Sequence, residues 1–556
     1  MKHLKHIIIS FFVFSISLSF GTEVNDTISN DTTDFQEELL RVETGLKTRN
    51  DKFRVIPFGE KGVLQFCRSG ESEHSKQKMW SLKFYNINLK EIWSKEIIID
   101  KRMDFKGMDT DDNNLYILLF DEHFKKSKNN IQIISLNIIE RKVTSLNTKI
   151  SEEVIIDYFK VYNKKAFLGG KIKPSTSSRI LQGFLTFTLL PAITGINVVK
   201  YQPALFKIDL NTATNEKISK KFKGQTFVQS MQKSVHDKNM YVVYKNFIPK
   251  DKNALYINTF SKNVNNYEEI KLTSSDNKRK LNYAKILTLD SDKKIIIGTY
   301  NNAVKGKKAN PVFNDFQEES VGLFITTLDN DKPQYLNFYN FSELKNFYNN
   351  YSKNRALKIK GRAKSKKAKG KELSYDYKLL IHDIVQNNDK FYLLLELYYP
   401  EYHTETYYYY DYYGRPNTRY YTVFDGYNYT NAIITCFDKA GNLLWDDSFN
   451  MQNITSFDLQ KRVELFFDDN IPILVYAYNK SIFYKIISND PEIQDQGQTN
   501  IENLYENDKV LSDYNDNIKY WYKNYFITSG YQKIKNRNYK GKTRRTVFYL
   551  NKISFE

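Results

Sequence analysis

The chain has 556 residues, of which 41% are hydrophobic, 15% aromatic and 26% charged, and it holds two cysteines. This composition excludes a disordered, a collagen-like and a disulfide-stapled chain, and it allows a large core. The formal net charge of +19 indicates an anionic partner, and the distribution of charge along the chain decides where that partner would bind.

The first residues have the pattern of a secretory signal peptide. A short basic start is followed by residues 7–20, which are uncharged but too few to span a bilayer. Ser19 and Gly21 are the small residues expected before a cleavage site. We therefore expect residues 1–21 to be removed, and the mature protein to be periplasmic, outer-membrane-associated or extracellular. The alternative is a buried or membrane-anchored N-terminal segment.

Residues 22–50 are expected to form a flexible leader and one short helix. The first part is polar and acidic, without apolar periodicity. Asp34 and Glu37 then form a capping-box pattern at the start of a helix. Apolar residues recur behind them at helical spacing. They are Phe35, Leu39, Val42 and Leu46.

Residues 51–556 contain a repeated signature of a short polar turn followed by an apolar run. The eight copies begin at Glu60, Asp112, Asn163, Asp237, Asp292, Asn388, Asp468 and Tyr522. Asn and Asp suit tight hairpin turns, and the aromatic or aliphatic runs suit buried strands. A further strand-like run precedes each copy, and a second hairpin follows most of them.

Four-stranded units at a spacing of about fifty residues are typical of a β-propeller. We therefore predict an all-β fold, a β-propeller of seven or eight four-stranded blades with long loop insertions on one face. The last unit ends in its third strand, so residues near the N-terminus are expected to supply the fourth. A β-sandwich pair or a β-helix is the alternative architecture.

Two of these units carry a tryptophan in their second hairpin, in residues 89–93 and 441–445. These hairpins resemble the Gly/Trp repeats of the pyrroloquinoline-quinone-type propellers. That superfamily includes quinone-dependent dehydrogenases and non-enzymatic outer-membrane assembly scaffolds, so the resemblance implies a propeller fold. No matching set of quinone or calcium ligands is recognisable, and we expect no cofactor.

Four unusual segments interrupt the repeat, and each falls in the same class of connection. Because antiparallel strands reverse direction, the turn between the first two strands and the turn between the last two share one face. The connections between the second and third strands, and between blades, share the other face. All four segments belong to this second class.

The first segment, residues 180–199, has no charged residue. Its apolar residues are Phe184, Leu185, Phe187, Leu189 and Leu190. Pro191 and its place between two strands of one sheet argue against a membrane-spanning helix. It is either a loop packed on the propeller or an exposed loop that docks on a membrane or a partner.

The second segment, residues 353–371, holds ten basic residues and no acid, behind a short helix expected from Ser342. Such a block repels itself, so we expect it to be mobile until an anion binds. The candidate binding residues are Lys358, Lys360, Arg362, Lys364, Lys366, Lys367 and Lys369. A solvated loop without a partner is the alternative.

The third segment, residues 398–429, is rich in tyrosine, which offers a large stiff ring and one hydroxyl. It suits stacking on sugar rings or a protein interface, and Glu405, Asp411 and Asp425 add acceptors for hydroxyl groups. The candidate binding residues are Tyr402, His403, Tyr407, Tyr409, Tyr412, Tyr420 and Tyr427. The alternative is a long β-hairpin that packs on its neighbours.

The fourth segment, residues 533–545, holds seven basic residues. The candidates are Arg537, Lys540, Arg544 and Arg545. The tip of an exposed hairpin is the alternative. Without the signal peptide the net charge is +17, without residues 353–371 it is +7, and without residues 533–545 it is zero. The propeller body is therefore formally neutral.

No catalytic or metal-binding motif is recognisable. The acid-rich stretch 109–114 lacks the glycine and glutamate of a calcium loop, and no histidine pair has zinc-like spacing. Glu401, His403 and Glu405 alternate in a strand-like stretch and are expected to point the same way. Cys67 and Cys436 lie in strand-like runs, where we expect two buried free thiols rather than a disulfide.

The sequence favours a non-catalytic binding or scaffold propeller of the cell envelope. The expected partners are an envelope protein, anionic lipid head groups or an anionic polysaccharide, with peripheral membrane contact and without nucleic acid. The alternative is a carbohydrate-active enzyme, a glycoside hydrolase or lyase, with the tyrosines as its platform and Glu401, Glu405 or Asp411 as its carboxylates.

Overall fold

The computed structural model describes most of the chain, in two compact units. The residues outside its description are 1–39, 47–51, 69–76, 122–128, 174–200, 235–236, 248–253, 262–266, 275–277, 291, 303–318, 349–352, 370–376, 489–495, 539–542 and 556. The first unit takes its described residues from 1–99 and 462–556, and the second takes them from 100–461. The two units are described one at a time below, with the sheets numbered as blades in chain order.

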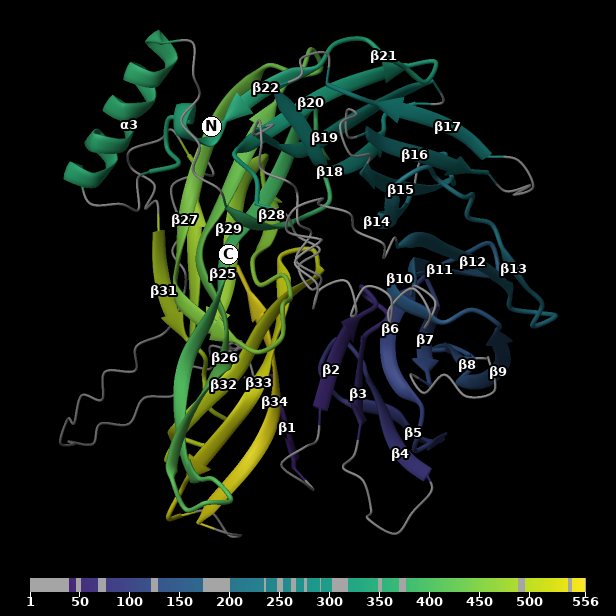
Figure 1. Ribbon diagram of the computed structural model, residues 1–556. Helices are drawn as coiled ribbons and strands as arrows, with labels where there is room; N and C mark the ends of the chain where they lie inside the picture. Colours follow the sequence, from purple (N-terminus) through teal and green to yellow (C-terminus); the bar gives the residue numbers. More distant parts are fainter. Residues whose placement is uncertain are drawn as a thin grey trace, which may run out of the picture. The chain divides into compact units, whose positions relative to one another are not determined.

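The second unit holds five antiparallel sheets, blades 2 to 6 (Figure 1). Blade 2 consists of β6 (Asp104–Thr110), β7 (Asn114–Phe120), β8 (Asn129–Asn137) and β9 (Lys142–Ile150). Blade 3 consists of β10 (Val154–Tyr162), β11 (Lys165–Ile172), β12 (Gln202–Asp209) and β13 (Asn215–Lys217). Blade 4 consists of β14 (Gln225–Lys233), β15 (Met240–Phe247), β16 (Ala254–Phe260) and β17 (Tyr267–Leu272).

In the last two blades of this unit one of the four strands is split in two. Blade 5 consists of β18 (Arg279–Thr288), β19 (Lys293–Asn302) and β20 (Gly322–Asp329), with β21 (Lys332–Pro333) and β22 (Asn337–Asn340) sharing the fourth position. Blade 6 has β23 (Lys378–Ile381) and β24 (Val385–Asn387) in the first position, then β25 (Lys390–Tyr410), β26 (Pro416–Phe437) and β27 (Leu443–Ser456). The described part of the connection between these blades contains η1 (Phe341–Glu343) and α3 (Lys353–Ala368).

The first unit holds three sheets, blades 1, 7 and 8. Blade 1 consists of β2 (Lys52–Pro57), β3 (Val63–Arg68), β4 (Gln77–Tyr85) and β5 (Glu91–Asp100). Blade 7 consists of β28 (Glu464–Asp468), β29 (Ile471–Tyr478), β30 (Ser481–Ile486) and β31 (Gln496–Asn500). Blade 8 consists of β32 (Lys509–Tyr522), β33 (Tyr525–Lys535), β34 (Arg544–Ser554) and β1 (Arg41–Gly45).

The predicted fold class is confirmed, since the chain is an all-β propeller whose described residues form eight four-stranded blades. Each of the eight predicted turn signatures joins the first and second strands of one blade. Two of these turns show why the sequence specifies them. Asn163 and Lys164 both have positive φ, as do Asp469 and Asn470, and two-residue hairpin turns require this backbone while Asn and Asp tolerate it.

Blade 8 takes its fourth strand from the N-terminal region, as the sequence predicts. β1 pairs antiparallel with β34, from Arg41 opposite Asn551 to Gly45 opposite Val547. The helix predicted over residues 35–46 is therefore wrong for Arg41–Gly45. Val42 and Leu46 also fit a strand, and pairing with β34 lets them pack on the core of blades 8 and 1 while the backbone is hydrogen-bonded.

The hydrophobic core of each unit lies between consecutive blades. One cluster joins Ile295 and Ile297 of blade 5 to Leu393 and Leu395 of blade 6. The two tryptophans of the predicted repeat begin the fourth strands of their blades, where Trp93 stacks on Phe84 at 5.5 Å between ring centroids. Beyond these two hairpins the structure adds no support for the pyrroloquinoline-quinone-type resemblance.

The first strands of blades 2 to 5 contact one another in succession, and each contains a β-bulge. The register of each strand skips one residue near its middle. The extra residues are Lys106, Asp157, Gln229 and Asn282. In blade 6 the break between β23 and β24, at residues 382–384, has the same effect. A bulge leaves one residue unpaired and redirects its side chain.

Both cysteines are free and buried, as predicted. Burial raises the pKa of the Cys436 thiol to about 11, so the reactive thiolate is scarce at neutral pH. Among the described residues no helix has the length and apolar character needed to cross a membrane.

Candidate functional site

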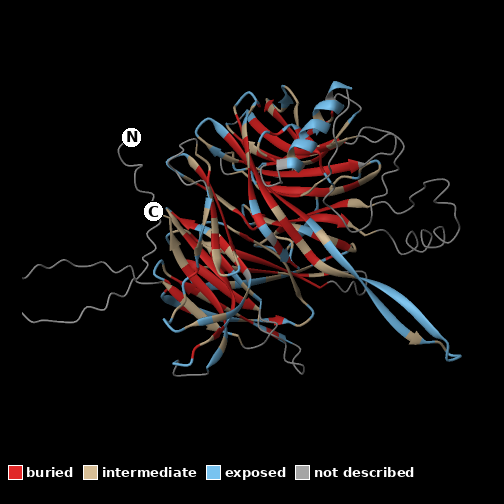
Figure 2. Cartoon of the chain, turned by 90° about the vertical axis from the view of Figure 1, so that its left-hand side faces the viewer, coloured by how far each residue is buried: buried red, intermediate tan, exposed pale blue. Residues whose placement is uncertain are grey.

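The tyrosine-rich segment forms a long hairpin that extends beyond its blade. β25 has 21 residues and β26 has 22, and the two strands pair as far as Tyr410 opposite Pro416. Figure 2 shows the outer half of this hairpin as an exposed arm. Tyr398 and Tyr429 at its base are buried, whereas Tyr408 is 76% exposed. The predicted hairpin is present, but its outer tyrosines do not pack on a neighbouring blade.

A tight turn closes the tip of the hairpin. Asp411 accepts backbone hydrogen bonds from Tyr413 and Arg415 through its carboxylate, both at 2.9 Å. Gly414 has φ of +70°, the left-handed conformation that favours glycine. Tyr412 at this turn is 98% exposed. The Asp411 carboxylate, a candidate catalytic group, is therefore engaged in holding the turn.

One face of the outer hairpin carries only tyrosine, threonine, phenylalanine and proline. Residues directly opposite each other in the ladder share a face, so the register assigns this set. The Tyr/Thr face consists of Tyr402, Thr404, Thr406, Tyr408, Tyr410, Pro416, Thr418, Tyr420, Thr422 and Phe424. It holds no charged side chain, and it offers rings and hydroxyl groups to solvent.

The opposite face, here called the charged face, carries the ionisable groups. It consists of His403, Glu405, Tyr407, Tyr409, Asn417, Arg419, Tyr421 and Val423. Arg419 lies over the ring of Tyr409, 4.8 Å from its centroid, and donates to its hydroxyl. Tyr407 and Tyr409 stack at 6.2 Å between centroids. The side chains of this face already bind one another.

His403 is the centre of a small polar cluster on this ribbon. Its Nδ1 lies 2.6 Å from a carboxylate oxygen of Asp425, and its Nε2 lies 3.4 Å from one of Glu405. The hydrogen bonds to Asp425 and Glu405 raise the pKa of the exposed imidazole. Glu401, predicted to join it, instead lies 3.5 Å from the amide of Asn428. Across the described residues no three His, Cys, Asp or Glu side chains are arranged to hold a metal ion.

The predicted aromatic residues divide between the two faces and the base. Tyr402 and Tyr420 lie on the Tyr/Thr face, whereas Tyr407 and Tyr409 lie on the charged face. Tyr427 packs near the base, 5.6 Å from Tyr398 between ring centroids. Tyr408 and Tyr410 are not among the predicted candidates, although their period-two spacing from Tyr402 is the signal that places them on one face.

The basic segment before blade 6 is a helix, which corrects the expectation of a mobile block. Helix α3 packs through Ile359, which is buried among the core residues of blades 5 and 6. Ala356 and Ala363, one turn to either side, contact the same core. The incoming chain is fixed by Asp446, whose carboxylate accepts from the backbone of Lys345 and Asn346 at 2.8 and 2.7 Å. Apolar contacts at helical spacing therefore outweigh the charge repulsion.

The predicted cationic side chains that the structure describes lie on the solvent side of this segment. The exposed ones are Lys358, Lys360, Arg362, Lys364, Lys366 and Lys369. The side chain of Lys367 lies outside the description. In both Figure 1 and Figure 2, α3 lies beside the end of blade 6 that is opposite the tip of the hairpin. The helix and the hairpin are therefore two separate surfaces.

The C-terminal basic segment connects β33 and β34, and its basic residues differ in exposure. Arg537 and Arg544 are exposed, and Lys540 lies outside the described residues. Arg545 has a different role from the one predicted. Its guanidinium forms an ion pair with the Glu43 carboxylate, at 2.9 Å, and a second ion pair with Asp508. Arg545 is a structural residue of blade 8 whose charge is neutralised by these carboxylates.

Two predicted segments are outside the described residues. These are the signal peptide, residues 1–21, and the apolar loop that contains Phe184, Leu185, Phe187, Leu189 and Leu190.

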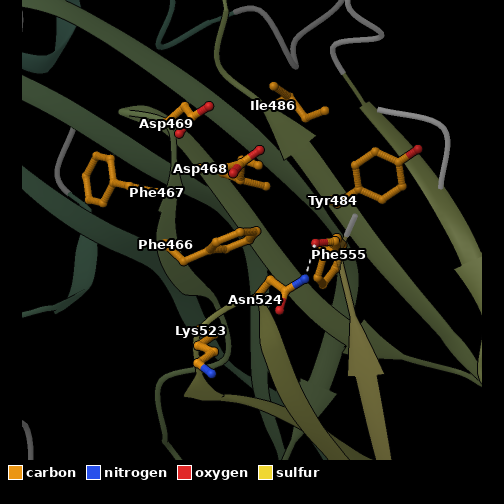
Figure 3. Close-up of a pocket in the computed structure, with 10 residues that line it drawn as sticks. Phe466, Phe467, Asp468, Asp469, Tyr484, Ile486, Lys523, Asn524 and Phe555 are labelled. Atoms are coloured by element: carbon orange, nitrogen blue, oxygen red, sulfur yellow. Dashed lines mark hydrogen bonds between the residues drawn. The ribbon is translucent and has the colours of Figure 1, made fainter. Parts of the chain in front are cut away.

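The first unit has a pocket of about 380 Å³ at the ends of blades 7 and 8 (Figure 3). Phe466, Tyr484 and Phe555 form its walls, and all three belong to the core of these blades or pack on it. Asn524 donates to the backbone oxygen of Phe555 at its edge, at 3.2 Å. The pocket is a gap at the end of the core, and none of the predicted site residues lines it.

Comparison with known proteins shows likeness in fold only. No family model and no curated protein matches this chain. The β-propeller domain of the Trilobed protease from Pyrococcus furiosus aligns over 82% of this chain and 96% of its own, with 10% identity and a TM-score of 0.32. A Synechocystis apocarotenoid oxygenase mutant aligns over 52% of this chain and 64% of its own, with 11% identity and a TM-score of 0.28. At these scores neither likeness bears on function.

Proposed function

We propose that this protein is a non-catalytic, exported binding protein that holds a polysaccharide of the cell envelope on the Tyr/Thr face of its hairpin. The observation that carries the proposal is the uncharged, exposed Tyr/Thr face itself. Tyrosine rings present flat apolar surfaces to sugar rings, and their hydroxyls, with those of threonine, bind sugar hydroxyls. Export rests on the signal-peptide pattern of residues 1–21.

The hairpin is suited to binding because little must be ordered when a ligand arrives. Tyrosine has few rotatable bonds, so its immobilisation costs little conformational entropy. The strands are hydrogen-bonded along their whole length to Tyr410 and Pro416, which keeps the rings in register. The spacing of alternate residues along a strand, about 6.6 Å, lets Tyr408 and Tyr410 contact an extended chain together.

The exposed cations of α3 supply a second, less specific attraction. A block of Lys and Arg raises the local concentration of anionic envelope components without selecting a structure. Replacing Lys358, Arg362, Lys364 and Lys366 with glutamine should weaken retention on an anionic matrix and flatten its dependence on salt. Unchanged retention would remove α3 from the proposal and leave the hairpin in it.

The hairpin proposal is tested by binding to isolated envelope fractions. The mature protein is mixed with envelope treated with protease, or with periodate, which cleaves the vicinal diols of sugars. Binding that survives protease and is lost after periodate supports a polysaccharide. Binding that is lost after protease and survives periodate identifies a protein partner and overturns the proposal.

Two double variants separate the two faces of the hairpin. Tyr408→Ala with Tyr420→Ala removes rings from the Tyr/Thr face, and Tyr407→Ala with Tyr409→Ala is the matched control on the charged face. All four side chains lie in the outer hairpin, away from the core. We expect the first pair to lower affinity about tenfold or more and the second to leave it nearly unchanged. Equal losses would contradict the assignment.

A carbohydrate-active enzyme is the second candidate, and the His403 cluster is the observation that favours it. Asp425 and Glu405 flank an imidazole whose raised pKa suits a proton donor near neutral pH. The cluster lies on an exposed two-stranded ribbon. Turnover of a glycan panel, abolished by Glu405→Gln, would establish this alternative, and a panel without turnover would remove it.

A further inference from the structure

The first strands of blades 3 to 6 form most of the lining of an open cavity in the second unit. Its volume is about 660 Å³, which is within the range of small-ligand sites. Its walls come from β10, β14, β18 and the β23–β24 region, with Lys461 at one side. No residue of the tyrosine hairpin or of α3 lines it. The cavity is therefore separate from both surfaces described above.

The bulges bring polar groups to this cavity. Asp157 and Gln229, the extra residues of β10 and β14, both line it, and Asp383 lines it from the break in the first strand of blade 6. Successive bulges are also linked, because the Gln229 amide donates to the backbone oxygen of Asn282. An ordinary strand at these positions would alternate its side chains between the two faces of the sheet.

One of these groups is a buried acceptor that no described residue satisfies. Gln229 is 6% exposed, and its Oε1 has no hydrogen-bond partner among the described residues. Leaving a buried amide oxygen without a donor is costly. This oxygen has almost no accessible surface, so a ligand hydroxyl satisfies it only when the amide turns toward the cavity.

The lining carries a net positive formal charge. Four lysines and two aspartates line the cavity, which gives +2. The lysines are Lys160, Lys233, Lys285 and Lys461, and the aspartates are Asp157 and Asp383. Lys160 and Lys233 share the carboxylate of the buried Asp109, at 3.2 and 2.7 Å. Two cations on one carboxylate leave a positive charge on that wall.

Lys285 and Asp383 form the central polar pair. Their side chains meet at 2.7 Å, and the Gln232 amide donates to the same oxygen at 3.2 Å. Lys285 is nearly buried, whereas the Asp383 side chain is 67% exposed and accessible from the cavity. Burial opposes ionisation of Asp383, but Lys285 and Lys461 outweigh it and hold the pKa of this carboxyl well below its usual range. The pair is charged at neutral pH, and the carboxylate can accept hydroxyl groups.

From this arrangement we propose that the cavity binds a small hydroxylated anion, the class of sugar acids and sugar phosphates. Lysine ammonium groups bind the anionic group as point charges. The accessible carboxylate of Asp383 accepts hydroxyls, and the Tyr283 ring forms part of the wall. A neutral sugar lacks the anionic group that the lysines bind, so we expect it to bind more weakly than a sugar acid or sugar phosphate.

The proposal is tested by calorimetric titration of the mature full-length chain with glucuronate, glucose 6-phosphate and glucose. Glucuronate and glucose 6-phosphate distinguish carboxylate from phosphate ligands, and glucose is the neutral control. Binding of either anion with a dissociation constant below about 1 mM, and at least tenfold weaker binding of glucose, supports the proposal. Absence of binding by both anions, or equal binding of glucose, overturns it.

A charge variant inside the cavity and a matched one outside it locate the binding. Lys285→Gln keeps the side chain polar, and the accessible Asp383 stays hydrated. We expect affinity for the bound anion to fall at least tenfold in this variant and to be unchanged in Lys142→Gln, which replaces an exposed lysine of β9 outside the cavity. Equal losses in both would overturn the assignment. If Lys285→Gln does not fold, the anion that binds in the titration is soaked into crystals of the unmodified protein. Density for it in the cavity supports the proposal, and density only elsewhere contradicts it.

Discussion

The guanidinium of Arg41 donates from Nη2 to the side-chain oxygen Oε1 of Gln532 at 2.6 Å, across 491 positions of sequence. The same guanidinium donates to the backbone oxygen of Glu502 at 2.8 Å and lies over the ring of Tyr549. Glu43, its ion-pair partner, also binds Arg545. One buried arginine therefore fastens β1 to the rest of blade 8.

Replacing Arg41 with methionine should lower the free energy of unfolding by about 3 kcal/mol, because it leaves buried acceptors without a donor and Glu43 with Arg545 as its remaining cation. Urea denaturation followed by circular dichroism measures the change. Arg102→Met is the control, since the Arg102–Asp100 ion pair is exposed and its loss should leave the urea midpoint unchanged. Equal midpoints for the two variants would contradict this account.

Gly298→Ala should destabilise the protein by about 2–3 kcal/mol, because an added methyl group would overlap the backbone oxygen of Tyr283 beside the bulge of β18. Gly361→Ala in α3 is the matched control. No atom lies within 4 Å of the added group there, and alanine favours a helix by about 1 kcal/mol over glycine. The urea midpoint should fall for the first variant and be unchanged or higher for the second.

Ile359→Ala should release α3 from the core of blades 5 and 6. We expect its backbone amides to exchange with deuterium roughly tenfold faster, which corresponds to about 1.4 kcal/mol. Added salt should slow exchange in the unmodified helix, since Lys360 and Lys364, four residues apart, repel each other. Leu357→Ala, on the exposed side of the same helix, should change nothing. Equal exchange rates in the two variants would show that Ile359 does not anchor α3.

The imidazole of His403 should titrate above its ordinary pKa of 6.5, because hydrogen bonds to Asp425 and Glu405 favour the protonated form. The linked stabilisation is fully present below pH 6.5 and is lost as the pH rises through the higher pKa of the folded state. NMR titration of the ring protons measures the midpoint. Asp425→Asn should move it back toward 6.5, and a midpoint at or below 6.5 in the unmodified protein would refute the cluster.

The turns and strands of the blades are predictable because their signals are local. Asn163 and Lys164 form a two-residue hairpin turn, and the apolar runs on either side of them indicate strands. The tyrosine hairpin is predictable for the same reason, but the exposure of Tyr408 is not, because it depends on how far the neighbouring blades extend.

Other features depend on partners that lie far away in the sequence. Val42 is compatible with a helix or a strand. It lies in a strand because β1 pairs with the edge of β34. The like charges of α3 predict a mobile segment. Ile359 packs on the core of two blades instead, and this distant contact holds the helix in place. The bulge at Asp157 has no sequence signature, so the sequence does not predict the cavity that Asp157 lines.

The pairing of Arg41 with Asn551 also sets the order in which the fold is completed. Blades 1 to 7 each draw their strands from one stretch of chain, so the loops that their hairpins close are far shorter than that of blade 8. Blade 8 closes a loop of 510 positions, which makes its fourth strand a late event. Until then β34 presents an unpaired edge, the kind of edge on which strands of other molecules add. A newly made chain in which β1 has not yet paired is therefore open to misassembly at β34, and a chaperone that covers β34 would protect it.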